Sequence, residues 1–191
     1  MTSYLIRSIE VTDTHFLWEM LYQALYIPPE VTPLTRDVIF QPELAKYVQN
    51  WGIYQNDIGL IAVVAESQTL VGAVWLRMFK SNNPGYGYIN DYTPELSIAV
   101  LPEHRGQGIG TQLITTLLSE VKDCYSAVSL SVSLDNPALH LYDRLGFEVV
   151  TQSGDSLIMK KDLYNSDRHI KIFQKQDNLI NIRNCLDKIE F

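Results

Sequence analysis

The sequence is short of cysteines, of positive charge and of long apolar runs, and each shortage argues against a class of protein. Cys124 and Cys185 are the only cysteines among 191 residues, and neither lies in a metal-site or catalytic pattern. Lys and Arg number 15 against 22 Asp and Glu, and the net charge of −7 argues against nucleic acid as a main partner. No apolar run is long enough to cross a bilayer, and the first residues contain no secretory h-region with a cleavage site. We therefore expect a cytoplasmic protein with structural thiols, no metal and no membrane partner.

The remaining sequence is an ordinary globular mixture, with 46% hydrophobic and 19% charged residues. Helical and strand periodicities alternate along it. The expected elements are a strand over 4–10, a helix capped by Thr12 or Asp13 and running to Tyr26, a short helix over 42–49, a hairpin over 58–79, a strand over 95–100, a helix after Gly110, a strand over 127–133, a helix from Pro137 to Leu145 and a hairpin over 147–161. This order predicts one mixed α/β domain over residues 1–162.

Residues 163–191 lie outside that pattern. Leu179, Ile182, Leu186 and Ile189 recur with helical spacing and predict a C-terminal amphipathic helix. Such a helix docks on the domain, pairs with a partner chain in a homodimer, or frays as a tail.

The stretch "HRGQGIGTQL", residues 104–113, places three glycines directly before a predicted helix. Glycines let a ligand approach the main chain closely, and the first amides of a helix bind anions. The stretch therefore predicts a phosphate-bearing ligand. A Walker loop is excluded because Thr111 and Gln112, not a lysine, follow Gly110. A dinucleotide fingerprint fits poorly, because Thr111 and Leu113 occupy the positions of its last glycine.

Arg105, Gly108 and Gly110 instead form the pattern R-x-x-G-x-G after a strand. With this pattern, "LSIAVLPEHRGQGIGTQLI" and "NPALHLYDRLGFEVV" resemble the two signature segments of the GNAT superfamily of acyl-CoA-dependent N-acyltransferases. The resemblance covers roughly residues 1–162. It implies a twisted, mostly antiparallel sheet flanked by helices, acetyl-CoA as co-substrate, and direct transfer of the acetyl group to an amine of a small molecule or peptide.

The resemblance also implies roles for individual residues. The strand residues Ile98, Ala99 and Val100 would pair with the pantetheine arm, and the Ile98 N–H would polarise the thioester carbonyl. Asn136 would bind the pantetheine amide or simply cap the helix that follows it, and Tyr142 would protonate the departing thiolate or only pack in the core. The amides expected to face the pyrophosphate belong to Arg105, Gly106, Gln107, Gly108, Ile109, Gly110 and Thr111.

The acceptor side is less specific in sequence. Glu95 is the best-placed base by family analogy, acting directly, through water, or only by attracting a cationic amine. The alternative interpretation of Glu95 is an ordinary charge at a strand end. Asp91 and Tyr92 are the second choices for the base. The residues predicted as pocket walls, with core packing as the alternative for each, are Trp18, Tyr22, Tyr26 and Tyr86.

Two other readings of the sequence compete with an acetyltransferase. A chain with this fold could bind acyl-CoA, or a partner, without transferring anything. "GDSL" at residues 154–157, with Asp167 and His169 downstream, matches a hydrolase motif in letters. However, Gly154 and Asp155 stand where a hairpin turn is needed, which explains them without catalysis.

Overall fold

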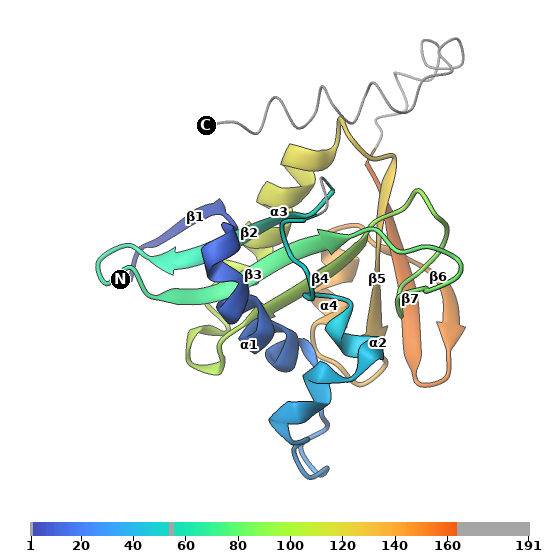
Figure 1. Ribbon diagram of the computed structural model, residues 1–191, viewed down its shortest axis with the longest axis horizontal. Coiled ribbons are helices and arrows are strands. Elements are labelled where there is room, and N and C mark those ends of the chain that lie inside the picture. Colours follow the sequence, from blue (N-terminus) through green and yellow to red (C-terminus); the bar gives the residue numbers. More distant parts are fainter. Residues whose placement is uncertain (1, 54–55, 164–191) are drawn as a thin grey trace.

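The protein is built around a single seven-stranded sheet (Figure 1). The computed structural model describes residues 2–53 and 56–163. The strands run in the order β1-β2-β3-β4-β5-β7-β6. The elements are β1 (Tyr4–Ser8), α1 (Thr14–Ala24), α2 (Pro42–Ala45), β2 (Ile58–Val64), β3 (Leu70–Arg77), β4 (Glu95–Val100), α3 (Ile109–Val121), β5 (Ala127–Ser133), α4 (Leu139–Arg144), β6 (Glu148–Ser153) and β7 (Ser156–Asp162).

One pair of neighbouring strands differs from the others in a way that matters for function. Neighbouring strands pair antiparallel everywhere except at β4 and β5, which are parallel. These two strands pair only at Glu95 and Ser129, and they diverge beyond that point. The mixed, mostly antiparallel sheet with flanking helices is confirmed, and the divergence opens a gap in its middle.

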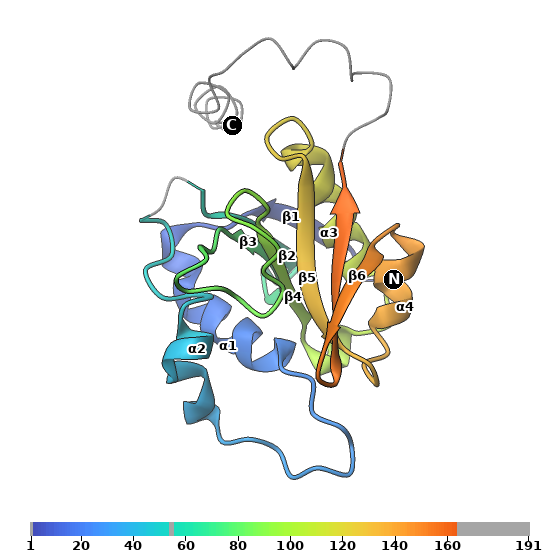
Figure 2. The same ribbon diagram turned by 90° about the vertical axis from the view of Figure 1, so that its right-hand side faces the viewer.

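Helices cover both faces of the sheet. Figure 2 shows α1 and α2 on one side and α3 and α4 on the other. Along β3, Val74 and Leu76 pack with the α3 cluster, whereas Ala73 and Trp75 pack with the α1 cluster. This alternation follows from the two-residue period of a strand, and it gives the domain two hydrophobic cores separated by the sheet. No helix of the described residues has both the length and the apolar character of a bilayer span.

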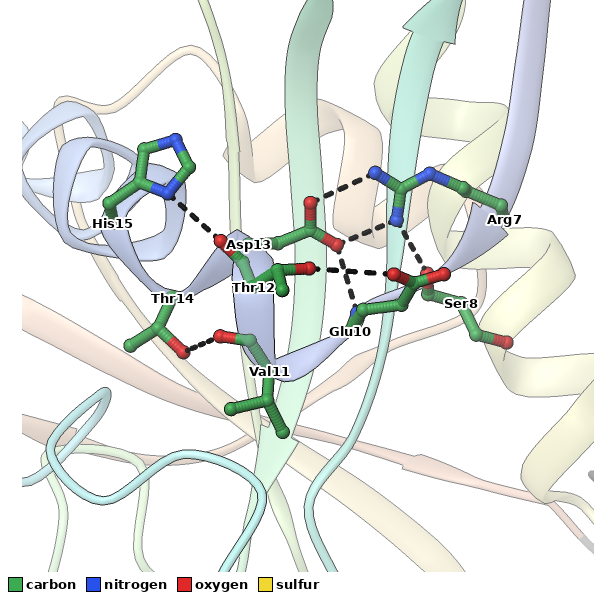
Figure 3. A network of polar contacts seen from close by, with 8 residues as sticks. All are labelled: Arg7, Ser8, Glu10, Val11, Thr12, Asp13, Thr14 and His15. Atoms are coloured by element: carbon green, nitrogen blue, oxygen red, sulfur yellow. Dashed lines mark hydrogen bonds and ion pairs between the residues drawn. The ribbon is translucent and has the colours of Figure 1, made fainter.

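A polar network holds the start of α1 against β1 (Figure 3). Arg7 donates to both carboxylate oxygens of Asp13, at 2.6 and 2.9 Å, and the Glu10 N–H donates to the same carboxylate at 2.9 Å. The hydrogen bonds from Arg7 hold the pKa of Asp13 below its usual range. Asp13, rather than Thr12, occupies the cap position, but its side chain makes no capping bond to α1. Its bonds to Arg7 and to the Glu10 N–H instead tie the start of α1 to β1.

Some predicted boundaries are wrong. α1 ends at Ala24 rather than Tyr26, and α2 covers only residues 42–45 of the predicted 42–49. Gly154, with φ +58°, turns the chain between β6 and β7, so the "GDSL" letters belong to a hairpin as expected. Asp167, His169, Cys185 and the predicted C-terminal helix lie outside the described residues.

Candidate active site

A cleft of about 1150 Å³ opens where β4 and β5 diverge. Its walls come from the C-terminal half of α1, from β4, from the glycine segment before α3 and from the start of α4. Of the predicted site residues, Gln107 does not line it: its side chain bonds to the Tyr4 hydroxyl and the Glu103 carbonyl instead. The predicted residues that do line it are Glu95, Ile98, Ala99, Val100, Arg105, Gly106, Gly108, Ile109, Gly110, Thr111, Asn136 and Tyr142.

The edge of β4 presents main-chain groups to this cleft. The Leu101 N–H donates to the Val71 carbonyl across the β3–β4 ladder at 2.8 Å. Because hydrogen-bonded and non-bonded positions alternate along antiparallel strands, the N–H groups of Ile98 and Val100 point away from β3, toward the gap. The Val100 carbonyl faces the same way, since it accepts a bond from the Arg105 side chain at 2.9 Å. An extended ligand in the gap would meet a free strand edge.

The glycine segment gives the other end of the cleft a geometry that suits an anion. Gly106 and Gly108 have φ of +73° and +81°, and a Cβ at either position would meet nothing within 4 Å. Gly108 is the N-cap of α3, so the next amides have no partner inside the helix. A helix of 13 residues also carries positive potential at this end. The Arg105 guanidinium bridges the Val100 carbonyl and the Gln23 side chain, which places its charge at the mouth of the cleft.

Asn136 and Tyr142 lie on the α4 side of the cleft. The Asn136 side-chain oxygen accepts the Ala138 N–H at 2.9 Å in the turn before α4, but the N-cap of that helix is Ala138 and no side-chain bond caps it. Tyr142 packs edge-on against Phe147, with ring centroids 5.9 Å apart, and is 8% exposed. Burial raises the pKa of its phenol to about 12. Its hydroxyl makes no hydrogen bond with any described residue, so it is available to a ligand.

Glu95 is buried at the far end of β4, with 4% of its surface exposed. Its Oε1 accepts the Tyr47 hydroxyl at 2.7 Å, and that hydroxyl accepts the Tyr86 N–H at 2.7 Å. Its Oε2 has no hydrogen-bond partner among the described residues. Burial raises the pKa of Glu95 to about 7, although the Tyr47 hydrogen bond, the Gly87 N–H and the charge of Lys46 lower it. A carboxyl that titrates near neutral pH is suited to act as a general base.

The loop before β4 shapes this carboxyl site through two glycines. A Cβ at Gly85 would lie 2.1 Å from Oε2 of Glu95, and one at Gly87 would lie 3.0 Å from the carboxyl carbon. Only glycine allows the loop to lie this close. Tyr86, between them, stacks on Tyr47 with ring centroids 6.3 Å apart. The loop therefore carries Tyr86 to the cleft and shields Glu95 from water.

Sequence reasoning missed Tyr47. It lies 48 positions from Glu95, just after a short helix, and its spacing resembles that of an ordinary buried aromatic. Burial and the carboxylate beside it raise its pKa well above the usual value for a phenol. Tyr47 therefore remains a neutral hydrogen-bond donor at any physiological pH. No signal in the sequence singles it out.

The predicted pocket walls divide into two groups. Tyr22, Tyr26 and Tyr86 line the cleft. Trp18 does not line the cleft: it is partly buried, packs against the α1 core cluster and lies beside Phe40, with ring centroids 5.2 Å apart. The second-choice acids and bases lie elsewhere: the Asp91 carboxylate accepts the Tyr88 hydroxyl and the Ser81 N–H, and Tyr92 is 75% exposed. His104 lines the cleft beside the glycine segment, with its ring 3.1 Å from the Tyr4 hydroxyl.

Comparisons with known proteins agree with this geometry. The model of the acetyltransferase (GNAT) family matches residues 18–147. The L-amino acid N-acyltransferase MnaT of Escherichia coli is 38% identical over 63 residues, which are 32% of this chain and 37% of that protein. An N-alpha-acetyltransferase of Sulfurisphaera tokodaii is 45% identical over 58 residues, 29% of this chain and 35% of that protein. The matched segments thus span little more than a third of these relatives.

A solved structure extends the likeness to the whole fold. That of yncA from Salmonella typhimurium, determined with its cofactor acetyl-CoA, superposes with a TM-score of 0.61 at 21% identity. The superposition covers 86% of this chain and 96% of that one. At this identity the likeness concerns the fold.

Proposed function

Because the chain belongs to the acetyltransferase (GNAT) family, a family of acyltransferases, we propose that it moves an acetyl group from acetyl-CoA directly to an amine. One observation carries the proposal. A single cleft joins an anion site at the glycine segment, an unpaired strand edge on β4 and a buried carboxyl with a pKa of about 7. A diphosphate, an extended arm and a reacting amine would occupy these places in that order.

The residues of the cleft fit acetyl-CoA, which supplies an acyl group activated as a thioester. The amides of residues 106–111 would hold the diphosphate, with Arg105 adding charge at the mouth. The main-chain groups of Ile98 and Val100 would pair with the pantetheine arm as a neighbouring strand does. The Ile98 N–H would donate to the carbonyl oxygen as negative charge develops on it.

The acceptor amine must lose a proton before it attacks. An alkylamine with a pKa near ~10.4 is protonated at pH 7, and exposing its lone pair costs about 3.4 units at ~1.36 kcal/mol each, or roughly 4.6 kcal/mol. Glu95 would take this proton, directly or through water, because its pKa of about 7 leaves much of it ionised and its Oε2 has no partner among the described residues. Tyr47 would hold Oε1 in place through its hydrogen bond.

Tyr142 would assist the departing thiolate. A free thiol has a pKa near ~8.5, whereas the buried phenol has a pKa of about 12. Full proton transfer is therefore uphill by about 3.5 units, using the reference thiol value. We assign Tyr142 the role of a hydrogen-bond donor that stabilises the thiolate as it leaves, rather than that of a strong acid.

Binding and turnover test the proposal separately. Calorimetry with acetyl-CoA should show saturable binding, and thiol release from acetyl-CoA should rise when an amine panel is added. Absence of binding by folded protein would contradict the whole proposal. Binding without amine-dependent release would leave the other reading, a module that binds acyl-CoA and transfers nothing. A cytoplasmic location and a homodimer remain part of the proposal; size-exclusion chromatography should show the mass of two chains, and a monomer would contradict the homodimer.

A further inference from the structure

The part of the cleft around Glu95, here called the acceptor end, is aromatic and apolar. Apart from Glu95 itself, its walls are neutral. Tyr47 bonds to Glu95 and Tyr86 stacks on Tyr47. The uncharged tyrosines and leucines that line the same cleft from residues 22–44 are Tyr22, Tyr26, Leu34 and Leu44. Three of these rings come from α1, the segment after α2 and the loop before β4, so separate elements bring them together. Glu95 is the only acidic residue among the described residues that line the whole cleft.

Positive charge lies elsewhere in the cleft. The basic residues of its described lining are His104, Arg105 and Arg144. Arg105 is bound to the carbonyl of Val100, five residues along β4 from Glu95. At about 3.3 Å per strand residue, the Val100 position that holds Arg105 is roughly 17 Å from Glu95. Arg144 belongs to α4, on the other side of the sheet from α1 (Figure 2).

Two further cations lie near the acceptor end but outside its lining, and both have partners. Arg36 pairs with Glu19 and stacks over the Tyr22 ring at 4.7 Å. Lys46 donates to the Glu43 carboxylate and the Pro84 carbonyl, at 2.6 and 2.7 Å. Within residues 2–53 and 56–163, no basic side chain lines the acceptor end; the charge of Lys46 acts on Glu95 from outside the lining and is held by Glu43.

From this distribution of charge, and resting on the proposed function, we infer that the acceptor is an amine on an aromatic or apolar body without a carboxylate beside it. An arylalkylamine is the class that fits. Its ammonium would meet Glu95 and the faces of the tyrosine rings, and its body would fill the apolar walls. An α-amino acid would bring a carboxylate to within about 5 Å of Glu95, with no cation in the lining of the acceptor end to pair with it. A polyamine would bring a second ammonium with no second acid.

A matched set of acceptors tests the inference. We would measure kcat/KM by thiol release for phenethylamine, L-phenylalaninamide and L-phenylalanine, each expressed for the neutral amine. Phenylalaninamide controls for bulk, since it differs from phenylalanine in charge and hardly in shape. Two carboxylates about 5 Å apart at an effective dielectric constant near ~20 repel enough to lower kcat/KM for phenylalanine by about 100-fold or more. Spermidine should also be poorer than phenethylamine.

Each outcome bears on the inference. Phenylalanine or spermidine turned over as well as phenethylamine would overturn it while leaving the proposed acetyltransferase activity intact. Binding of acetyl-CoA with no amine turned over would instead contradict the proposed function.

A variant tests the charge argument from the side of the protein. Leu34 lines the cleft beside Tyr22, whose hydroxyl donates to its carbonyl, and at 45% exposure it can accommodate a longer charged side chain. Leu34→Arg would place a cation near the α-carboxylate of an amino acid. The ratio of kcat/KM for phenethylamine to that for phenylalanine should fall by about tenfold, and the Kd for acetyl-CoA should stay unchanged. A folded Leu34→Arg protein with the original preference would count against the inference.

Discussion

Replacing Tyr47 by Phe should shift the pH dependence of the enzyme and leave its maximal activity largely in place. The Tyr47 hydroxyl donates at 2.7 Å to Oε1 of Glu95, and this bond stabilises the ionised carboxylate. A hydrogen bond to a charged group contributes about 1.5–3 kcal/mol. At ~1.36 kcal/mol per unit, its loss should raise the pKa of Glu95 by about 1–2 units, from about 7.

The effect on activity follows from the ionised fraction of Glu95. At pH 7 about half of the wild-type protein carries the carboxylate, whereas a variant with a pKa of about 8–9 carries it in about 1–10% of molecules. The value of kcat/KM should therefore fall about 5- to 50-fold at pH 7 and recover most of that loss by pH 9.5. The measurement is a profile of kcat/KM between pH 5.5 and 10, followed by thiol release.

A matched control separates this effect from a general loss of structure. Tyr88→Phe removes the same kind of phenol–carboxylate bond, at 2.6 Å to Asp91, in the loop before β4 but outside the cleft lining. It should leave the profile unchanged. A Tyr47→Phe loss that is equal at every pH would show that Tyr47 only supports the fold. An unshifted profile with full activity would refute the assignment of Glu95 as the titrating base.

Three further predictions concern single residues. Glu95 has a folded pKa of about 7 against an ordinary value of 4.5, so its contribution to stability is present below pH 4.5 and lost as pH rises through 7. The free energy of unfolding of Glu95→Gln should therefore rise by about 3 kcal/mol relative to the wild type between pH 4.5 and 8, as measured by urea unfolding. A difference that stays constant with pH would contradict the burial argument. Gly108→Ala and Gly154→Ala both place a Cβ at positive φ in open space. Each should cost about 1 kcal/mol, but only Gly108→Ala should weaken acetyl-CoA binding in calorimetry. Tyr142→Phe should lower kcat by about 10- to 100-fold with an unchanged acetyl-CoA Kd, and full turnover would remove Tyr142 from the mechanism.

Local sequence patterns determined much of this protein. The bounds of β4 and the hairpin at Gly154 follow from periodicity and turn chemistry, which act between near neighbours. The predicted α3 is present too, although it begins at Ile109 and includes Gly110, rather than starting after it. The proposed anion site could likewise be predicted from local sequence, because one short segment carries both the glycines and the helix start. The same locality explains the errors at the ends of α1 and α2, where tertiary contacts rather than propensity decide the last turn.

The tertiary structure decided the chemistry around Glu95. Its pKa of about 7 comes from burial beneath a loop that only Gly85 and Gly87 allow so close, and its partner Tyr47 comes from a distant segment. The gap between β4 and β5 exists because two strands that lie far apart in sequence pair at one position and then diverge. Desolvation and non-local pairing depend on what the folded chain brings together, and one-dimensional patterns carry no record of that.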